Sequence, residues 1–219
     1  MSTASLAKTA YDEVVEELIE QINMGRSYEE LFDSLYDRLR GAVPYNRIAV
    51  ALLKPSGDGL TLISCHSDGP ESLKVGYSAP VEGSTLRELL RTGQPRIIND
   101  LPDYLAQKPH SVSTMLIVKE GMCSNLTLPL VASGKPIGVV FFSSRETGTY
   151  DEHHARLLKR LAGHIAISIE KAQFLQKLEQ EVHRQTIELK RSEERYQLLV
   201  GLGQIIKAQS VAKIEPLLS

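Results

Sequence analysis

The sequence predicts an α+β fold in which a sheet is covered by helices on both faces and a long helix follows it. Two strands, Asn125–Val131 and Pro136–Ser143, carry apolar residues on both faces and no charged residue, which is typical of doubly covered strands. The segment from about Asp151 to Val200 contains no Pro and a single Gly. Fifty helical residues span roughly 75 Å, more than twice the width of a small domain. The two halves of this helix must therefore have different surroundings.

The composition is that of a soluble globular chain, and it excludes several classes of function. Of the 219 residues, 42% are hydrophobic and 24% are charged. The formal net charge of −2 gives no basic field for direct contact with nucleic acid or a membrane surface. No apolar run has the length of a membrane span, and the N-terminal residues lack the order of a signal peptide. We therefore expect a cytoplasmic protein.

Two helices are expected before the sheet. Apolar residues recur every four positions over residues 6–22, and Gly25 ends this pattern. Ser27 and Glu30 then form a capping box for a second helix. We expect residues 1–26 to form a separate N-terminal helix.

The sequence predicts short strands, short helices and loops in the middle of the chain. Arg47–Leu53 and Leu60–Cys65 are separated by a turn with Pro and Gly, which predicts a hairpin. Thr85–Arg91 is expected to be a short helix that Ser84 caps and Gly93 ends. The remaining expected elements are a weak strand near Leu73–Ala79, a strand at Arg96–Ile98, a loop from Asp103 and a short helix over Ser113–Val118.

The two halves of the long helix have different apolar patterns. As far as Ala172, an apolar stripe fits packing on the sheet. Beyond it, eight residues follow alternating three- and four-residue steps, and they are called the seam residues below: Leu175, Leu178, Val182, Gln185, Leu189, Ser192, Tyr196 and Leu199. Charges of both signs balance on the other faces, as in a coiled coil. We expect residues 175–200 to pair two chains; the alternative is a lone solvated helix that frays, because two seam residues are polar.

A new apolar pattern starts after Gly201-Leu202-Gly203 and stops at the C-terminal residue. We expect residues 201–219 to be the start of a further domain. On this interpretation the sequence is a fragment of a longer protein.

Several segments resemble the GAF domain family in the same order. They are Leu39–Ile48, Glu82–Leu86, Gly93–Leu101, Glu120–Leu130, Gly134–Ser144 and Tyr150–Ala166. The resemblance covers about Tyr28–Phe174, so we expect residues 27–174 to be a GAF-like sensory domain. It implies an antiparallel sheet with helices on both faces and a small-molecule pocket beside the middle segments. Residues 178–196 resemble the linker that joins sensor domains in bacterial signalling proteins.

The expected pocket combines polar groups with apolar walls. The candidate lining residues are Asn99, Asp100, Leu101 and Tyr104 in the loop, Met115 on the short helix, and Ser124 and Leu126 on the strand. The alternative is that Asn99 and Asp100 only cap a turn and that Met115 only fills the core.

No catalytic residue, metal site or cofactor is expected. The histidines show no metal spacing, and the two cysteines are isolated in the sequence. Some photosensory GAF domains hold a bilin through a Cys-His pair, but Cys65-His66 lies earlier in the chain than that pair. A few GAF proteins reduce free methionine sulfoxide, yet Cys123 does not match the position of their Cys. His183 is interpreted as a solvated linker residue, because the pattern of a phosphoacceptor does not follow it.

We therefore expect a sensory or regulatory input domain of a bacterial signal-transduction protein, either a sensor kinase of a two-component system or a transcription regulator. It would bind an unknown small molecule and relay the signal through a dimeric helical linker to an output domain. The homodimer would form through the N- and C-terminal helices. The alternatives are a ligand-free dimerisation spacer and a GAF-type free methionine sulfoxide reductase.

Overall fold

The computed structural model describes residues 13, 16, 20, 36–40 and 43–214, with side chains as far as residue 202. Of the helix expected over residues 1–26, only Glu13, Glu16 and Glu20 are described, and each is helical; its other residues and the capping box lie outside the described residues. Contacts divide the chain into two units, Met1–Ala172 and Gln173–Ser219. The helix α6, Glu152–Ile214, has residues in both.

The first unit is built around a six-stranded antiparallel sheet, as predicted. Its strands lie in the order β3-β2-β1-β6-β5-β4. They are β1 (Arg47–Leu53), β2 (Gly59–Ser67), β3 (Ser78–Pro80), β4 (Arg96–Ile98), β5 (Ser124–Ala132) and β6 (Lys135–Ser144). The predicted hairpin of β1 and β2 and the predicted strand pair β5 and β6 are both present. Because β1 also pairs with β6, the first strands and the last strands form one sheet.

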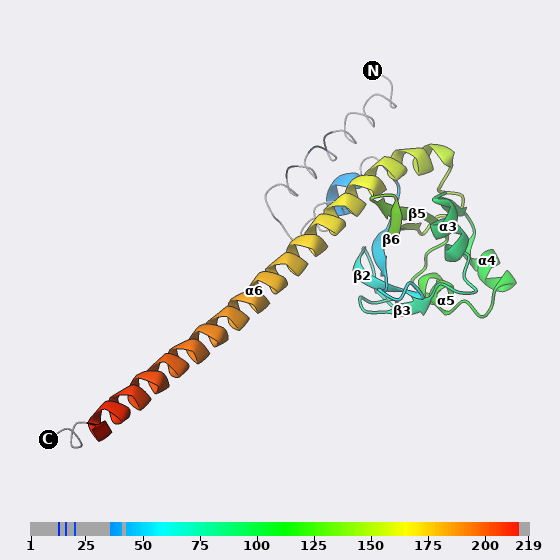
Figure 1. The fold of residues 1–219 in the computed structure, drawn as a ribbon. Coiled ribbons are helices and arrows are strands. Elements are labelled where there is room, and N and C mark those ends of the chain that lie inside the picture. Colours follow the sequence, from blue (N-terminus) through cyan, green and yellow to red (C-terminus); the bar gives the residue numbers. More distant parts are fainter. Residues whose placement is uncertain (1–12, 14–15, 17–19, 21–35, 41–42, 215–219) are drawn as a thin grey trace. The chain divides into compact units, whose positions relative to one another are not determined.

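Helices cover both faces of this sheet (Figure 1). The first part of α6 covers one face, and three short helices cover the other: α3 (Leu86–Thr92), α4 (Leu101–Gln107) and α5 (Val112–Lys119). Helix α3 ends at Gly93, whose φ of 67° lies in the left-handed region that favours Gly.

Helix α4 corrects the prediction of a loop in this segment. The carboxylate of Asp100 accepts a hydrogen bond from Asp103 N at 2.9 Å, and Pro102 occupies the first turn. Asp followed by Pro is also common in turns, so the sequence pattern supports both readings. In the structure, Asp100 has the extended backbone conformation of an N-cap residue, and the residues after it are helical.

The core between the sheet and α6 is mainly apolar and tightly closed. Leu126 and Leu128 of β5 and Phe142 of β6 have no exposed surface, and they pack with Leu158 and Ile165 of α6. The apolar stripe predicted for the first half of the long helix therefore faces the sheet. Apolar burial of this kind stabilises each large side chain by about 1.5–3 kcal/mol.

The opposite face of β1 carries smaller side chains. Ile48 and Val50 pack toward α6, whereas Ala49 and Ala51 belong to the cluster under α3, α4 and α5. Successive strand residues point to opposite faces, so this difference follows directly from the sequence of β1. The short side chains leave space on the face that the three short helices cover.

The second unit consists of the later part of α6. The helix runs through Gly201 and Gly203 to Ile214, so it extends beyond Val200, the end that the sequence pattern predicts for the long helix. A Gly inside a helix costs only about 1 kcal/mol relative to Ala, and neighbouring helical turns can outweigh that cost. The apolar seam residues from Leu175 to Leu199 are all exposed in this single chain. None of the helices described here combines the length and apolar character that crossing a bilayer requires.

Candidate functional site

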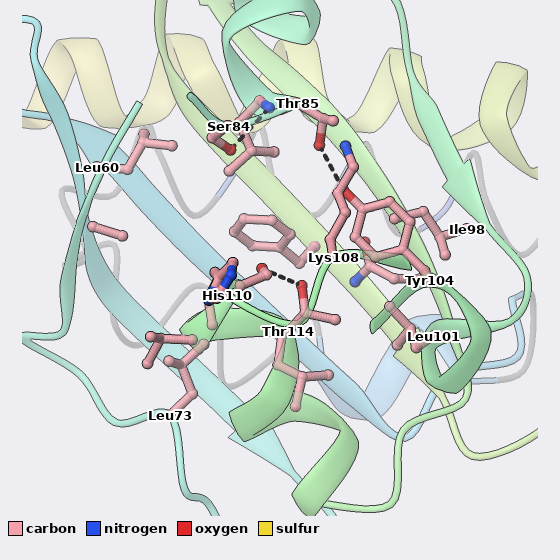
Figure 2. Close-up of a pocket in the computed structure, with 18 of the residues that line it drawn as sticks. Leu60, Leu73, Ser84, Thr85, Ile98, Leu101, Tyr104, Lys108, His110 and Thr114 are labelled. Carbon is pink, nitrogen blue, oxygen red and sulfur yellow. Dashed lines mark hydrogen bonds between the residues drawn. The ribbon is translucent and has the colours of Figure 1, made fainter. Parts of the chain in front are cut away.

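A cavity of about 640 Å³ lies on the sheet face covered by α3, α4 and α5 (Figure 2). Its size is within the range of about 300–1,000 Å³ that small-molecule sites have. Residues of the sheet form one wall, among them Ala51, Asn125 and Phe141. The other walls come from β2, β3, the 82–86 turn, α4 and α5. The cavity therefore exists only where separate parts of the chain meet.

Most of the cavity wall is apolar. The apolar lining residues are Ala51, Leu60, Leu62, Leu73, Tyr77, Ala79, Pro80, Leu86, Ile98, Leu101, Pro109, Val112, Ile117 and Phe141. Hydroxyl groups lie between them: Ser84 accepts a hydrogen bond from Leu86 N at 3.1 Å, and Ser111 and Thr114 are bonded to each other at 2.7 Å. Apolar walls with a few placed polar groups are the usual make-up of a small-molecule site.

One corner of the cavity is rich in cations and hydroxyl groups. Arg96 donates through Nη1 to Thr85 Oγ1 and through Nη2 to Thr127 Oγ1, the latter at 3.2 Å. Thr85 Oγ1 is also 3.1 Å from the hydroxyl of Tyr104. The ammonium of Lys108 lies 5.2 Å from the centre of the Tyr104 ring. Thr85, Arg96, Tyr104 and Lys108 are called the cationic corner below.

Two pKa shifts reflect the electrostatics of this corner. Burial lowers the pKa of the Arg96 guanidinium, because it disfavours the charged form. Burial opposes ionisation of Tyr104, but the hydrogen bond with Thr85 and the charges of Arg96 and Lys108 outweigh it, so the pKa of Tyr104 is lowered. The local potential at the Tyr104 hydroxyl is therefore positive.

Of the seven residues that the sequence nominated for the pocket, Leu101 and Tyr104 line the cavity. Asn99 instead holds the chain before α6: its amide donates to Tyr150 O at 2.7 Å and accepts from Tyr150 N at 3.0 Å. Asp100 caps α4. Asp100 thus has a local capping role, close to the alternative considered for it, whereas Asn99 bonds to the backbone of a residue far along the chain and does not cap a turn.

The other three nominated residues also lie away from the cavity. Met115 is 48% exposed, while its helix neighbours Thr114 and Ile117 line the cavity. Ser124 donates to the backbone oxygen of Glu146. Leu126 faces α6, because side chains alternate along β5 and Asn125 takes the cavity side.

Sequence reasoning missed most of the polar lining. Thr85, Arg96, Lys108 and Asn125 were not nominated, although each lies in or next to a predicted element. One feature of the sequence could have predicted part of this polar lining. Arg96 is a charged residue in a short predicted strand, and two Ile residues follow it. A charge at such a position needs polar partners, which could have directed attention to Thr85 and Thr127.

The cysteines do not belong to this site. Neither Cys65 nor Cys123 is among the lining residues. Burial raises the pKa of Cys65 to about 12, with the charge of Arg47 opposing the shift. A thiol with a raised pKa is a weak nucleophile near neutral pH. In the part of the chain that the structure describes, no group of three His, Cys, Asp or Glu side chains could hold a metal ion.

The fold is an α+β domain with an antiparallel sheet, helices on both faces and a cavity under the three short helices. A family model described as GAF domain matches residues 25–170 of this sequence. The chain belongs to the GAF domain family. This family consists of sensory and regulatory domains that bind small molecules. Among curated proteins, no sequence matches the chain.

Solved structures share this fold at low sequence identity. The GAF domain of a two-component sensor histidine kinase from Bacillus halodurans is 23% identical, with a TM-score of 0.57, covering 67% of this chain and 95% of that one. The phycoerythrobilin-bound GAF domain of a cyanobacterial phytochrome is 14% identical, with a TM-score of 0.61 and coverages of 76% and 97%. A free methionine-R-sulfoxide reductase from Neisseria meningitidis, in complex with its substrate, is 16% identical, with a TM-score of 0.60 and coverages of 80% and 95%. These three proteins differ in function, so the property they share with this chain is the fold.

Proposed function

We propose that this chain is the input domain of a cytoplasmic signal-transduction protein and that it binds a small molecule in the cavity under α3, α4 and α5. The observation that carries the proposal is a partly open, mainly apolar cavity of about 640 Å³ beside a closely packed core. Concave sites of this size, with apolar walls and a few placed polar groups, are the kind of site that small molecules occupy in proteins.

The sheet connects this cavity to α6. Phe141 lines the cavity, and the next residue, Phe142, packs in the core against α6. A ligand that shifts β6 would therefore alter the surface on which α6 packs. Ligand-dependent changes of this kind are transmitted as small shifts of packed helices. The later part of α6 would carry the change to an output domain.

A cavity-filling variant tests ligand binding. We expect Ala79→Trp to weaken binding of the neutral fluorescent probe N-phenyl-1-naphthylamine by about tenfold or more, because the indole occupies the probe's space. Probe fluorescence is excited outside the Trp absorption band. The matched control is Ala106→Trp, at an exposed position of α4 that does not line the cavity. Equal probe affinities in the wild type and both variants would contradict binding in this cavity.

We further propose that the seam residues join two chains into a parallel coiled coil. The exposed apolar side chains Leu178 and Leu189 lie on this seam, and Arg184 beside it forms ion pairs with Glu181 and Glu188 on its own helix. A single helix with this much exposed apolar surface is marginal in water, and pairing would bury it.

Replacing one seam residue should separate the chains. We expect Leu189→Asp to raise the dimer dissociation constant by about a hundredfold or more, since each chain loses a buried Leu worth about 1.5–3 kcal/mol. Sedimentation equilibrium measures the assembly. The matched control is Leu198→Asp, because Leu198 is equally apolar and exposed but lies off the seam. If a chain ending at Ala172 assembles as the full chain does, the seam has no role.

The spacer alternative is distinguished by the same two experiments. A domain that dimerises through the seam but binds no probe would act as a dimerisation spacer. A free methionine sulfoxide reductase would need a reactive thiol at its site, and the cavity lining contains no Cys.

A further inference from the structure

We propose that the cavity selects small organic anions, with an apolar body in the main chamber and one anionic oxygen group in the cationic corner. This inference rests on the proposed ligand-binding function and names the chemical class of its ligand. The class includes carboxylates, sulfonates and phosphate esters, which share oxygen acceptors and negative charge.

The first argument is the lack of a carboxylate partner for Arg96. Among the described residues, its guanidinium donates only to the neutral hydroxyls of Thr85 and Thr127. Its Nε is buried and has no hydrogen-bond partner. Charged groups in protein interiors are normally paired, because burial without a counter-charge is costly. Arg96 therefore keeps a charge without a counter-charge at the cavity wall.

The second argument is that a second cation lies at the same corner. Figure 2 shows Lys108 extended along Tyr104, and its charge acts on the Tyr104 hydroxyl. No ion pair joins Lys108 to a carboxylate within the described part of the chain. The positive potential of the two cations is also apparent in the lowered pKa of Tyr104, where it outweighs the effect of burial. An anion bound here would lie beside two cations and could accept the one hydroxyl hydrogen that the bond between Thr85 and Tyr104 leaves free.

The third argument is that no acid on the lining neutralises this corner. The lining contains a single carboxylate, that of Glu82. Its side chain is 77% exposed and pairs with Arg87, which does not line the cavity. The net charge of the lining is therefore positive, even though the whole chain carries −2. Charge complementarity of this kind discriminates between ligands by the cost of leaving a charge unpaired.

The rest of the cavity determines the remainder of the ligand. Leu60 and Leu73 form apolar walls away from the cationic corner (Figure 2), and Phe141 of β6 also lines the cavity. Small inorganic anions would fill the corner alone and leave most of the volume of about 640 Å³ empty. An anionic group on an aliphatic or aromatic body satisfies both parts of the site.

Two fluorescent probes with the same ring system test this inference. 1-Anilinonaphthalene-8-sulfonate carries an anionic group that N-phenyl-1-naphthylamine lacks. In the wild type we expect the sulfonate to bind the more tightly, and in Arg96→Met we expect its affinity to fall by about tenfold or more. The affinity of the neutral probe should stay within about twofold, because the apolar walls are unchanged.

Two further variants keep the test independent of folding. Lys108 is exposed, so Lys108→Met should fold normally and lower the sulfonate affinity selectively. The control is Arg91→Met, which removes an exposed cation of α3 outside the cavity and should leave both affinities unchanged. Octanoate and octyl phosphate should displace the sulfonate more strongly than octanol, and their ranking identifies the preferred anionic group.

Separate outcomes overturn the inference and the proposed function. If both probes bind the wild type equally, and Arg96→Met and Lys108→Met weaken neither selectively, the cavity binds ligands without selecting anions. If neither probe binds, or if Ala79→Trp leaves both affinities unchanged, ligand binding in this cavity fails and the inference fails with it.

Discussion

Replacing Glu120 with Gln is expected to lower the free energy of unfolding by about 3–5 kcal/mol, because it leaves a buried cation without its counter-charge. Glu120 Oε2 lies 3.0 Å from Arg47 Nε, and both side chains are fully buried. This contact is an ion pair without hydrogen-bond geometry. Glu120 Oε1 also accepts hydrogen bonds from Ser72 N and Leu73 N, both at 2.7 Å. The carboxylate thus joins β1, the loop before β3 and the end of α5.

Urea unfolding with a double-mutant cycle measures this effect. The side-chain oxygen that remains in Glu120→Gln can still accept from the loop amides, so the loss in this variant isolates the charge. Removing the partner as well, in Arg47→Met with Glu120→Gln, should restore a large part of the stability, since no uncompensated charge remains. Glu88→Gln is the control: its pair with Arg91 is exposed, and water screens it. A loss in Glu120→Gln as small as in this control would contradict the assigned role.

The second large effect is expected for Phe142→Ala, which should also destabilise the fold by about 3–5 kcal/mol through the void it creates. Phe142 has no exposed surface, and its ring centre is 5.7 Å from that of Tyr45 in an edge-to-face arrangement. It lies opposite Ile48 on β1 and opposite Leu126 on β5. The side chain therefore fills the centre of the core between the sheet and α6.

The neighbouring residue provides a matched comparison. Phe141 points to the cavity and is only partly buried, so Phe141→Ala should cost less than Phe142→Ala and should enlarge the cavity. Thermal and urea unfolding give the two stabilities. Equal losses of unfolding free energy in the two variants would mean that both faces of β6 are equally well packed. That result would contradict the assignment of Phe142 to the closed core and of Phe141 to the cavity.

Local patterns in the sequence were sufficient for most of the elements and for the type of fold. Alternation and turn residues predicted the hairpin of β1 and β2, and the apolar stripe up to Ala172 predicted packing of α6 on the sheet. The order of the segments from Leu39 to Ala166 indicated the GAF family, which the family model confirms. These features depend on residues that are close in sequence, so the sequence expresses them directly.

The cavity and its cationic corner depend on tertiary structure. Thr85 precedes α3, Arg96 lies on β4, Tyr104 on α4 and Thr127 on β5, and these residues meet only because β4 pairs with β5 and both helices cover the same face. The spacing of these residues in the sequence does not predict that their side chains are in contact. The sequence pattern nominated Leu126 for the pocket, but its neighbour Asn125 lines the cavity. Alternation along β5 predicts that these two side chains point to opposite faces of the sheet. Which of the two faces carries the cavity depends on where α6 packs.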